Sequence, residues 1–120
     1  MSNARVCFIA YITVESDQID QATAFFGERL ARQFGGATIA PAAGFWATDG
    51  DEVKARYDGD VLKEQALAIH LSVLPPQKDR ALQCLRDTGK EARKTLNLKA
   101  SAFHIEAWTT EAFHTDISIK

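Results

Sequence analysis

A histidine and a glutamate two residues apart are the clearest candidates for chemistry in this sequence. His104-Ile105-Glu106 lies in a segment where apolar and polar residues alternate. Alternate residues of a strand point to the same side, roughly 7 Å apart at the backbone. An imidazole and a carboxylate held in this way can act as a general acid and base. With His70, which lies in a second alternating segment, they are the catalytic candidates if this protein is an enzyme.

The same three residues have the composition of a two-histidine, one-carboxylate metal site. We nevertheless predict no metal and no other cofactor. A strand between the segments of His70 and His104 would separate them by about 9 to 10 Å, with Tyr11 or Ile9 between them. A shared metal ion needs ligand atoms within about 2.0 to 2.2 Å. Histidines that hydrogen-bond locally at a surface or an interface explain the pattern more simply.

Aromatic side chains supply the candidates for binding. Tyr11 and Trp108 fall on the same side of their strands as the two histidines, and Trp46 follows Gly44-Phe45 in an irregular stretch. A tryptophan in such a place lines the mouth of a ligand site or fills a gap in the core. The candidate binding residues are therefore Tyr11, Trp46, His70, His104 and Trp108.

Zinc-dependent deamination, cysteine catalysis and phosphate binding each need residues that this sequence lacks or holds in unsuitable places. Histidine-x-glutamate opens a zinc-deaminase pattern, but that pattern needs a later Cys-x-x-Cys, which this chain does not have. Cys7 and Cys84 fall in different elements without a histidine close in sequence, so we expect buried, reduced thiols instead of a nucleophile. Gly35-Gly36 follows a helix instead of opening one, which argues against a phosphate-binding loop.

Composition sets the class of protein. The chain has 120 residues, 46% hydrophobic and 25% charged, which suits one soluble domain over residues 1–120 with its core at about 5–108. A net charge of −2 lacks the basic surplus that nucleic-acid binding needs, so we expect no nucleic-acid partner. No stretch approaches the roughly 18 apolar residues of a membrane span, and no signal peptide precedes the first strand. We expect a cytoplasmic protein without membrane contact.

Hydrophobic periodicity predicts four strands and two helices. Alternation predicts strands over residues 5–14, 67–73 and 102–108. A first helix, capped by Ser16 or Asp17, carries apolar residues at three- and four-residue steps until Gly35-Gly36 ends it. Pro75-Pro76 suits the first turn of a second helix, which holds Gly89 in its interior, where close packing or a local kink would account for it. Residues 37–60, with turn signals at Asp49-Gly50 and Asp58-Gly59, predict a bent strand or a hairpin that projects from the sheet.

This order of elements predicts an α+β fold of the ferredoxin-like type. In this β-α-β-β-α-β two-layer sandwich, an antiparallel sheet carries both helices on one face, with the first and third strands in the middle. The layout over about residues 5–108 also resembles that of the small dimeric α/β-barrel proteins, in which two ferredoxin-like subunits pack sheet to sheet. That resemblance implies a homodimer, and an isomerase or oxygenase activity without a cofactor.

The last segment of the chain repeats the strand pattern. Phe113, Thr115, Ile117 and Ile119 alternate with polar residues after the fold is complete. Alternation predicts an extra C-terminal strand over residues 112–120, and the short connection favours pairing with a partner subunit. A disordered tail is the alternative.

Two functions fit these observations. In the first, the protein is a small homodimeric binding or interaction module, whose open sheet face is covered by another copy, a protein partner or a small apolar ligand. We expect this face to be covered because Ile9, Tyr11 and Trp108 would otherwise form an exposed apolar patch. In the second, it is a small cofactor-independent enzyme with a cavity lined by His70, His104, Glu106 and Tyr11. We favour the binding module over the enzyme.

Overall fold

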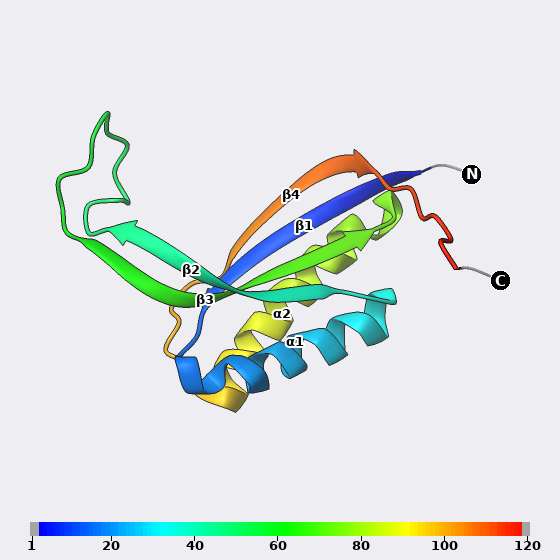
Figure 1. Ribbon diagram of the computed structural model, residues 1–120, viewed down its shortest axis with the longest axis horizontal. Helices are drawn as coiled ribbons and strands as arrows, with labels where there is room; N and C mark the ends of the chain where they lie inside the picture. Colours follow the sequence, from blue (N-terminus) through cyan, green and yellow to red (C-terminus); the bar gives the residue numbers. More distant parts are fainter. Residues whose placement is uncertain (1–2, 119–120) are drawn as a thin grey trace.

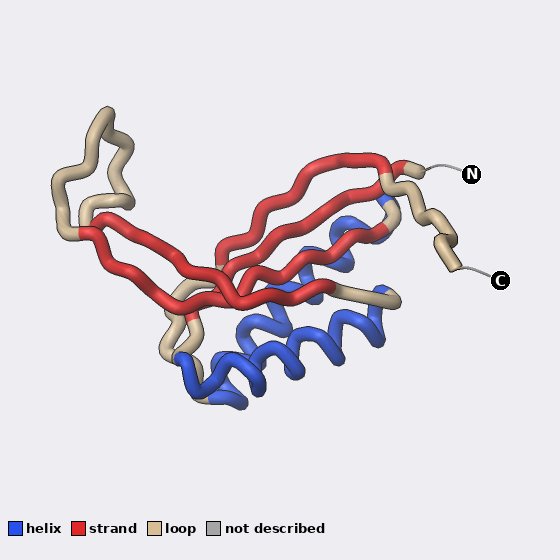
Figure 2. The backbone as a smooth tube through the Cα atoms, in the orientation of Figure 1, coloured by secondary structure: helices blue, strands red, loops and turns tan. Residues whose placement is uncertain are grey.

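The protein is built as one sheet with a layer of two helices on one side, and the computed structural model describes residues 3–118 (Figures 1 and 2). The strands pair antiparallel in the order β2-β3-β1-β4, which places β1 and β3 in the middle. This is the ferredoxin-like α+β sandwich that the sequence predicts. The elements are β1 (Ala4–Thr13), η1 (Ser16–Gln18), α1 (Ile19–Phe34), β2 (Thr38–Ala47), β3 (Val61–Val73), η2 (Pro75–Gln77), α2 (Lys78–Leu96) and β4 (His104–Glu111).

The core lies between the sheet and the helices. Alternate residues of the two central strands point toward the helices and are almost fully buried, among them Phe8, Ile12, Leu67, Ile69 and Leu71. The helices bury one stripe each against them, formed by Ala22, Phe26 and Leu30 in α1 and by Ala81, Leu85 and Ala92 in α2. Because apolar burial of this kind is the main favourable term in folding, these stripes fix both helices to one side of the sheet.

The helix ends follow the sequence signals with one correction. Gly35 ends α1 in the left-handed conformation, with φ of 88°, and its N–H donates to the carbonyl of Ala31 at 2.8 Å. Neither Ser16 nor Asp17 caps this helix as predicted. Both lie inside the 3₁₀ turn η1, whose N-cap is Glu15, because the chain tightens into that turn before α1 starts. Pro75 and Pro76 open the turn before α2 as expected.

The β2–β3 hairpin is longer than predicted and projects beyond the helices, at the left of Figure 1. β3 begins at Val61, six residues before the predicted start at Leu67. In those residues Val61 and Leu62 are exposed, and the segment lacks apolar alternation because no helix covers it. Pairing with β2 holds it extended, with Val61 opposite Ala47. Periodicity reports burial, so it could not locate a strand that is held mainly by backbone pairing.

The C-terminal strand does not form in the single chain. β4 runs to Glu111 instead of ending near residue 108, because it pairs with β1 as far as Ala4. The Ala112 N–H donates to the carbonyl of Asn3 at 2.9 Å, and residues 113–118 have no regular structure. Phe113 and Ile117 are 73% and 86% exposed, and Ile119 of the predicted strand lies outside the described residues.

Two further observations concern the helices and the cysteines. No helix within residues 3–118 is long and apolar enough to cross a membrane. Cys7 and Cys84 are free thiols, half-buried on β1 and α2 respectively.

Candidate functional site

The sheet side turned away from the helices, here called the open face, carries the side chains that the sequence singled out. Cross-strand partners of a sheet share a side, and the register forms three rows across β3, β1 and β4. The rows are Ala68, Tyr11 and His104; His70, Ile9 and Glu106; and Ser72, Cys7 and Trp108. The structure therefore places Tyr11, His70, His104, Glu106 and Trp108 on one face, as strand alternation predicts.

The middle of the open face is a floor of small side chains. Ala40 and Ala42 of β2 lie opposite Ala68 and Ala66 of β3, and the latter two are 9% and 8% exposed. Larger side chains border this floor, with Tyr11 on β1 and Trp46 on β2. A shallow apolar strip bordered by aromatic residues suits contact with a flat surface or a flat ligand.

The structure brings His104 and Glu106 together and keeps His70 apart from them, as the predicted strand order implies. His104 Nε2 lies 2.9 Å from Glu106 Oε2, and the side chains are 59% and 61% exposed. The Tyr11 ring stacks against His104, with centroids 6.5 Å apart and planes at 22°. His70 is separated from both by β1, where Ile9 stands between it and Glu106. Within the described residues, no three histidine, cysteine or acidic side chains are grouped to hold a metal ion.

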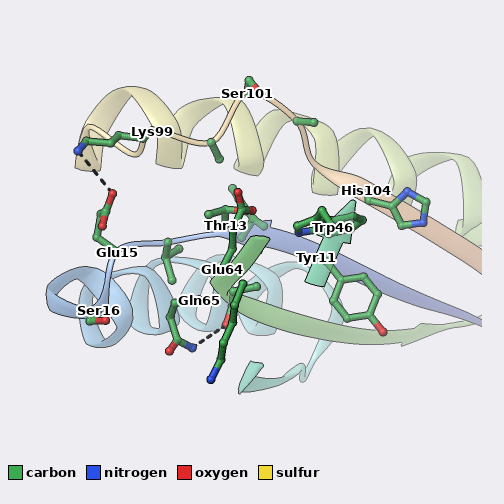
Figure 3. A pocket seen from close by; sticks show the side chains of 16 residues that line it. Tyr11, Thr13, Glu15, Ser16, Trp46, Glu64, Gln65, Lys99, Ser101 and His104 are labelled. Carbon is green, nitrogen blue, oxygen red and sulfur yellow. Dashed lines mark hydrogen bonds and ion pairs between the residues drawn. The ribbon is translucent and has the colours of Figure 1, made fainter. Parts of the chain in front are cut away.

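Three of the predicted binding residues meet in a cavity at one end of the open face, which we call the end pocket (Figure 3). It has a volume of about 680 Å³ and lies where β1 ends, between the base of the β2–β3 hairpin and residues 99–102. Tyr11, Trp46 and His104 line it, and the residues around them that the sequence did not single out include Thr13 and Glu64. The other two candidates, His70 and Trp108, lie on the open face outside it.

Glu64 is one of four charged residues that line the end pocket, with Glu15, Lys63 and Lys99. Its carboxylate accepts a hydrogen bond from Thr13 Oγ1 at 3.0 Å, and both residues are half-buried. At the outer end of the pocket Lys99 pairs with Glu15 at 3.5 Å. Within residues 3–118 Glu64 has no such cation. A half-buried carboxylate without a counter-charge favours a cation beside it.

Trp46 forms an aromatic wall of this pocket. A Cβ at Gly44 would lie 3.0 Å from the indole Nε1, so the glycine leaves room for the ring to lie along its own strand. The side chain remains 54% exposed. Of the two positions the sequence left open, the structure places Trp46 at the edge of a cavity and not in the core.

Thr13 and Glu64 were missed for a physical reason. Glu64 lies in the part of β3 that periodicity did not find, although it shares the open face with His70 at a spacing of six residues. Continuing the alternation of residues 67–73 toward the hairpin would have found it. Thr13 lies opposite Ala66, at the end of β1, where only the three-dimensional register shows which residue it meets.

No protein-family model and no curated protein matches this sequence. Among solved structures, CutA from Synechococcus elongatus PCC7942 is similar, with 12% identity over 92% of this chain and 81% of that chain, at a TM-score of 0.53. A phage SAM lyase in the apo state has 12% identity over 97% and 96%, at 0.52. The phage SAM lyase in complex with S-methyl-5′-thioadenosine has 13% identity over 93% and 92%, at 0.50. They share the fold. Identity this low carries no activity from one protein to another.

Proposed function

We propose that this protein is a small binding module that self-associates through its open face and holds a small organic cation in the end pocket. The observation that carries the proposal is the convergence of Tyr11, Trp46 and His104 with the unpaired carboxylate of Glu64 in one cavity. Self-association and a ligand site are compatible, because the pocket lies at one end of the face and leaves the rest free.

The case for self-association is the apolar surface that the fold leaves uncovered. Trp108 and Leu62 are 45% and 51% exposed, and both helices lie on the other side of the sheet. These two side chains lie at opposite ends of the open face, Trp108 opposite Cys7 and Leu62 opposite Trp46, so each is a separate exposed apolar position that a partner would cover. A second copy is the partner we favour, because it also offers a segment that needs cover, with Phe113 and Ile117 in the C-terminal tail. We retain the proposal that this tail pairs with the partner subunit.

The case for an organic cation is the chemistry of the end pocket. The faces of aromatic rings attract cations, tryptophan most strongly, and Trp46 is the exposed wall of the cavity. Glu64 adds a formal negative charge on a side chain fixed by Thr13. A volume of about 680 Å³ accommodates a molecule that has a flat ring as well as a charged group.

Two nucleosides that differ in a sulfonium charge test the proposed cation site. S-adenosylmethionine carries a sulfonium charge, and S-adenosylhomocysteine lacks that charge and one methyl group. Calorimetric titration is expected to show at least tenfold tighter binding of the sulfonium, and Glu64→Gln is expected to remove this preference. Glu111→Gln, at the far end of β4, serves as the matched control. Equal affinity for the two probes, or a preference that survives in Glu64→Gln, would exclude recognition of the sulfonium charge by Glu64.

The enzyme alternative rests on the 2.9 Å contact between His104 and Glu106 beside the same pocket. The pair has the geometry of a general base held by a carboxylate. His70 contributes nothing to it, since β1 separates them. Chromatography of the same titration mixtures decides between the two functions: consumption of S-adenosylmethionine that Glu106→Gln abolishes would establish an enzyme, and intact probe would favour a binding module.

A further inference from the structure

A second cavity lies on the helix side of the sheet, between α2 and the edge strand β4. Nothing in the sequence predicts this cavity, because the basic residues of the second helix are most simply interpreted as a solvated face. Its volume is about 370 Å³. We call it the basic groove and define it by an apolar floor and a charged rim, which are Gly89, Phe103 and Ile105 for the floor and Arg86, Lys90 and Arg93 for the rim.

The floor of the basic groove is held in place by close packing. A Cβ at Gly89 would lie 2.5 Å from Cδ2 of Phe103, so only glycine lets this ring rest against the helix backbone. On its other side the Phe103 ring contacts Phe26 of the core, with centroids 5.7 Å apart. The ring therefore has little room to move away, and the groove keeps an apolar base.

The rim collects cations without counter-charges. Arg86, Lys90 and Arg93 are spaced by four and three residues, which puts them on one side of a helix. Arg93 Nε donates to the carbonyl of Ala100 at 2.7 Å, and none of the three forms an ion pair within residues 3–118.

The acidic residues of the same part of α2 are on its other side. Asp87 and Glu91 line the groove between the two helices, where Glu91 pairs with Arg29 at 2.6 Å. Like charges four residues apart on a helix repel each other. An anion bound at the rim would relieve that repulsion, in a chain whose net charge is −2.

We propose that the basic groove binds a small apolar molecule that carries a carboxylate. The rim supplies two guanidinium groups, which match a carboxylate with paired hydrogen bonds, and the ammonium of Lys90. The floor supplies burial for an alkyl chain or a ring, and about 370 Å³ lies at the small end of the range for ligand pockets, about 300 to 1,000 Å³. A bare inorganic anion would leave the floor unused, and an apolar cation would be repelled by the rim.

Decanoate, decanol and decylamine share one alkyl chain and differ in charge, so they test the proposal directly. Calorimetric titration below the micellar range is expected to show decanoate binding at least tenfold tighter than the other two. Acetate, which lacks the chain, is expected not to bind at the concentrations that saturate the site with decanoate.

Charge reversal locates the site. The double variant Arg86→Glu with Lys90→Glu is expected to lower the affinity for decanoate at least tenfold, and the milder pair Arg86→Gln with Lys90→Gln is expected to lower it less. Lys78→Glu reverses one charge on the same helix outside the groove, and is expected to bind decanoate like the unmodified chain. Similar affinities for the three ten-carbon probes, or equal losses in the double variant and in Lys78→Glu, would overturn the proposal. Binding of S-adenosylmethionine in the end pocket is expected to be unchanged in the two double variants, so the proposals for the two sites are tested separately.

Discussion

His70 and Leu71 are neighbours in β3 that point to opposite sides of the sheet. Leu71 is 1% exposed in the core, and His70 lies exposed on the open face. Leu71→Ala is expected to lower the free energy of unfolding by about 2 to 5 kcal/mol, the range for truncating a buried leucine. His70→Ala is expected to change it by less than about 0.5 kcal/mol. Urea unfolding measures both, and equal losses would mean that His70 belongs to the core and not to the working surface.

Gly89 and Gly27 both lie inside helices, and replacing each by alanine is expected to change the stability in opposite directions. A Cβ at Gly89 would collide with Phe103, whereas a Cβ at Gly27 would lie 3.5 Å from Ile39 in ordinary contact. Gly89→Ala is expected to destabilise the protein by about 1 to 3 kcal/mol through overpacking. Gly27→Ala is expected to stabilise it by up to about 1 kcal/mol, because alanine is the better helix former. If thermal unfolding moved in the same direction for both variants, the Phe103 contact would not be the reason for Gly89.

At this scale the sequence predicts orientation better than contact. Strand parity, the alternation of successive side chains between the two faces of a sheet, was enough to put Tyr11, His104 and Trp108 on one face. Each of them is out of phase with its buried neighbours. Parity could not show that Thr13 meets Glu64, since 51 residues separate them in the chain. It also could not show whether Trp46 lines a pocket or fills the core, because both are compatible with an aromatic residue after a glycine.

Among the elements, the β2–β3 hairpin is the one whose end is organised by polar contacts instead of burial. In the loop of residues 48–60, the Asp49 carboxylate accepts hydrogen bonds from Lys54 Nζ at 2.9 Å and from the backbone N–H groups of Asp58 and Gly59 at 3.2 and 3.1 Å. The Lys54 ammonium first, and then these N–H groups, hold the pKa of Asp49 below its usual value. The Asp49 carboxylate therefore ties together the two sides of a loop whose base is also closed by a hydrogen bond from the Thr48 N–H to the Asp60 carbonyl at 2.9 Å.

This arrangement predicts how the loop responds to pH. Because the pKa of Asp49 is lowered in the folded loop, its contribution is fully present above the ordinary aspartate pKa and is lost as the pH falls through the lowered value. The amide resonance of Gly59 is expected to report this opening in an acid titration by NMR. In Asp49→Asn the transition should disappear, and Asp51→Asn, in the same loop, should retain it. A Gly59 amide insensitive to acid in the unmodified chain would show that Asp49 does not close the loop.

Element prediction succeeded where burial imposes a period and failed where it does not. The stripes of α1 and α2 face the core, so their positions could be read from spacing. The first half of β3 and the last residues of β4 are held by pairing with a neighbouring strand and have little cover, so their boundaries could not.

For the whole molecule, the C-terminal tail is an apolar segment that the single chain leaves uncovered. Phe113 and Ile117 alternate as in a strand, yet both are exposed in residues 113–118. Deleting residues 112–120 is expected to lower the molar mass in solution while changing the unfolding of each chain little, because the deletion would remove the proposed pairing of the tail with a partner subunit. Light scattering and urea unfolding measure the two effects. An unchanged mass together with unchanged stability would show that the tail contributes to neither.

The central claim, that the open face is covered by a second copy, is tested most directly by the molar mass of a face variant. The chain has a mass of 13.2 kDa, and the unmodified protein is expected to scatter light as an oligomer. Trp108→Glu puts a charge into the apolar part of the open face and is expected to yield the monomer mass. Val53→Glu changes a residue that is 101% exposed in the hairpin loop, and is expected to leave the oligomer intact. A monomeric unmodified protein, or an oligomer that persists in Trp108→Glu while the chain remains folded, would contradict the account.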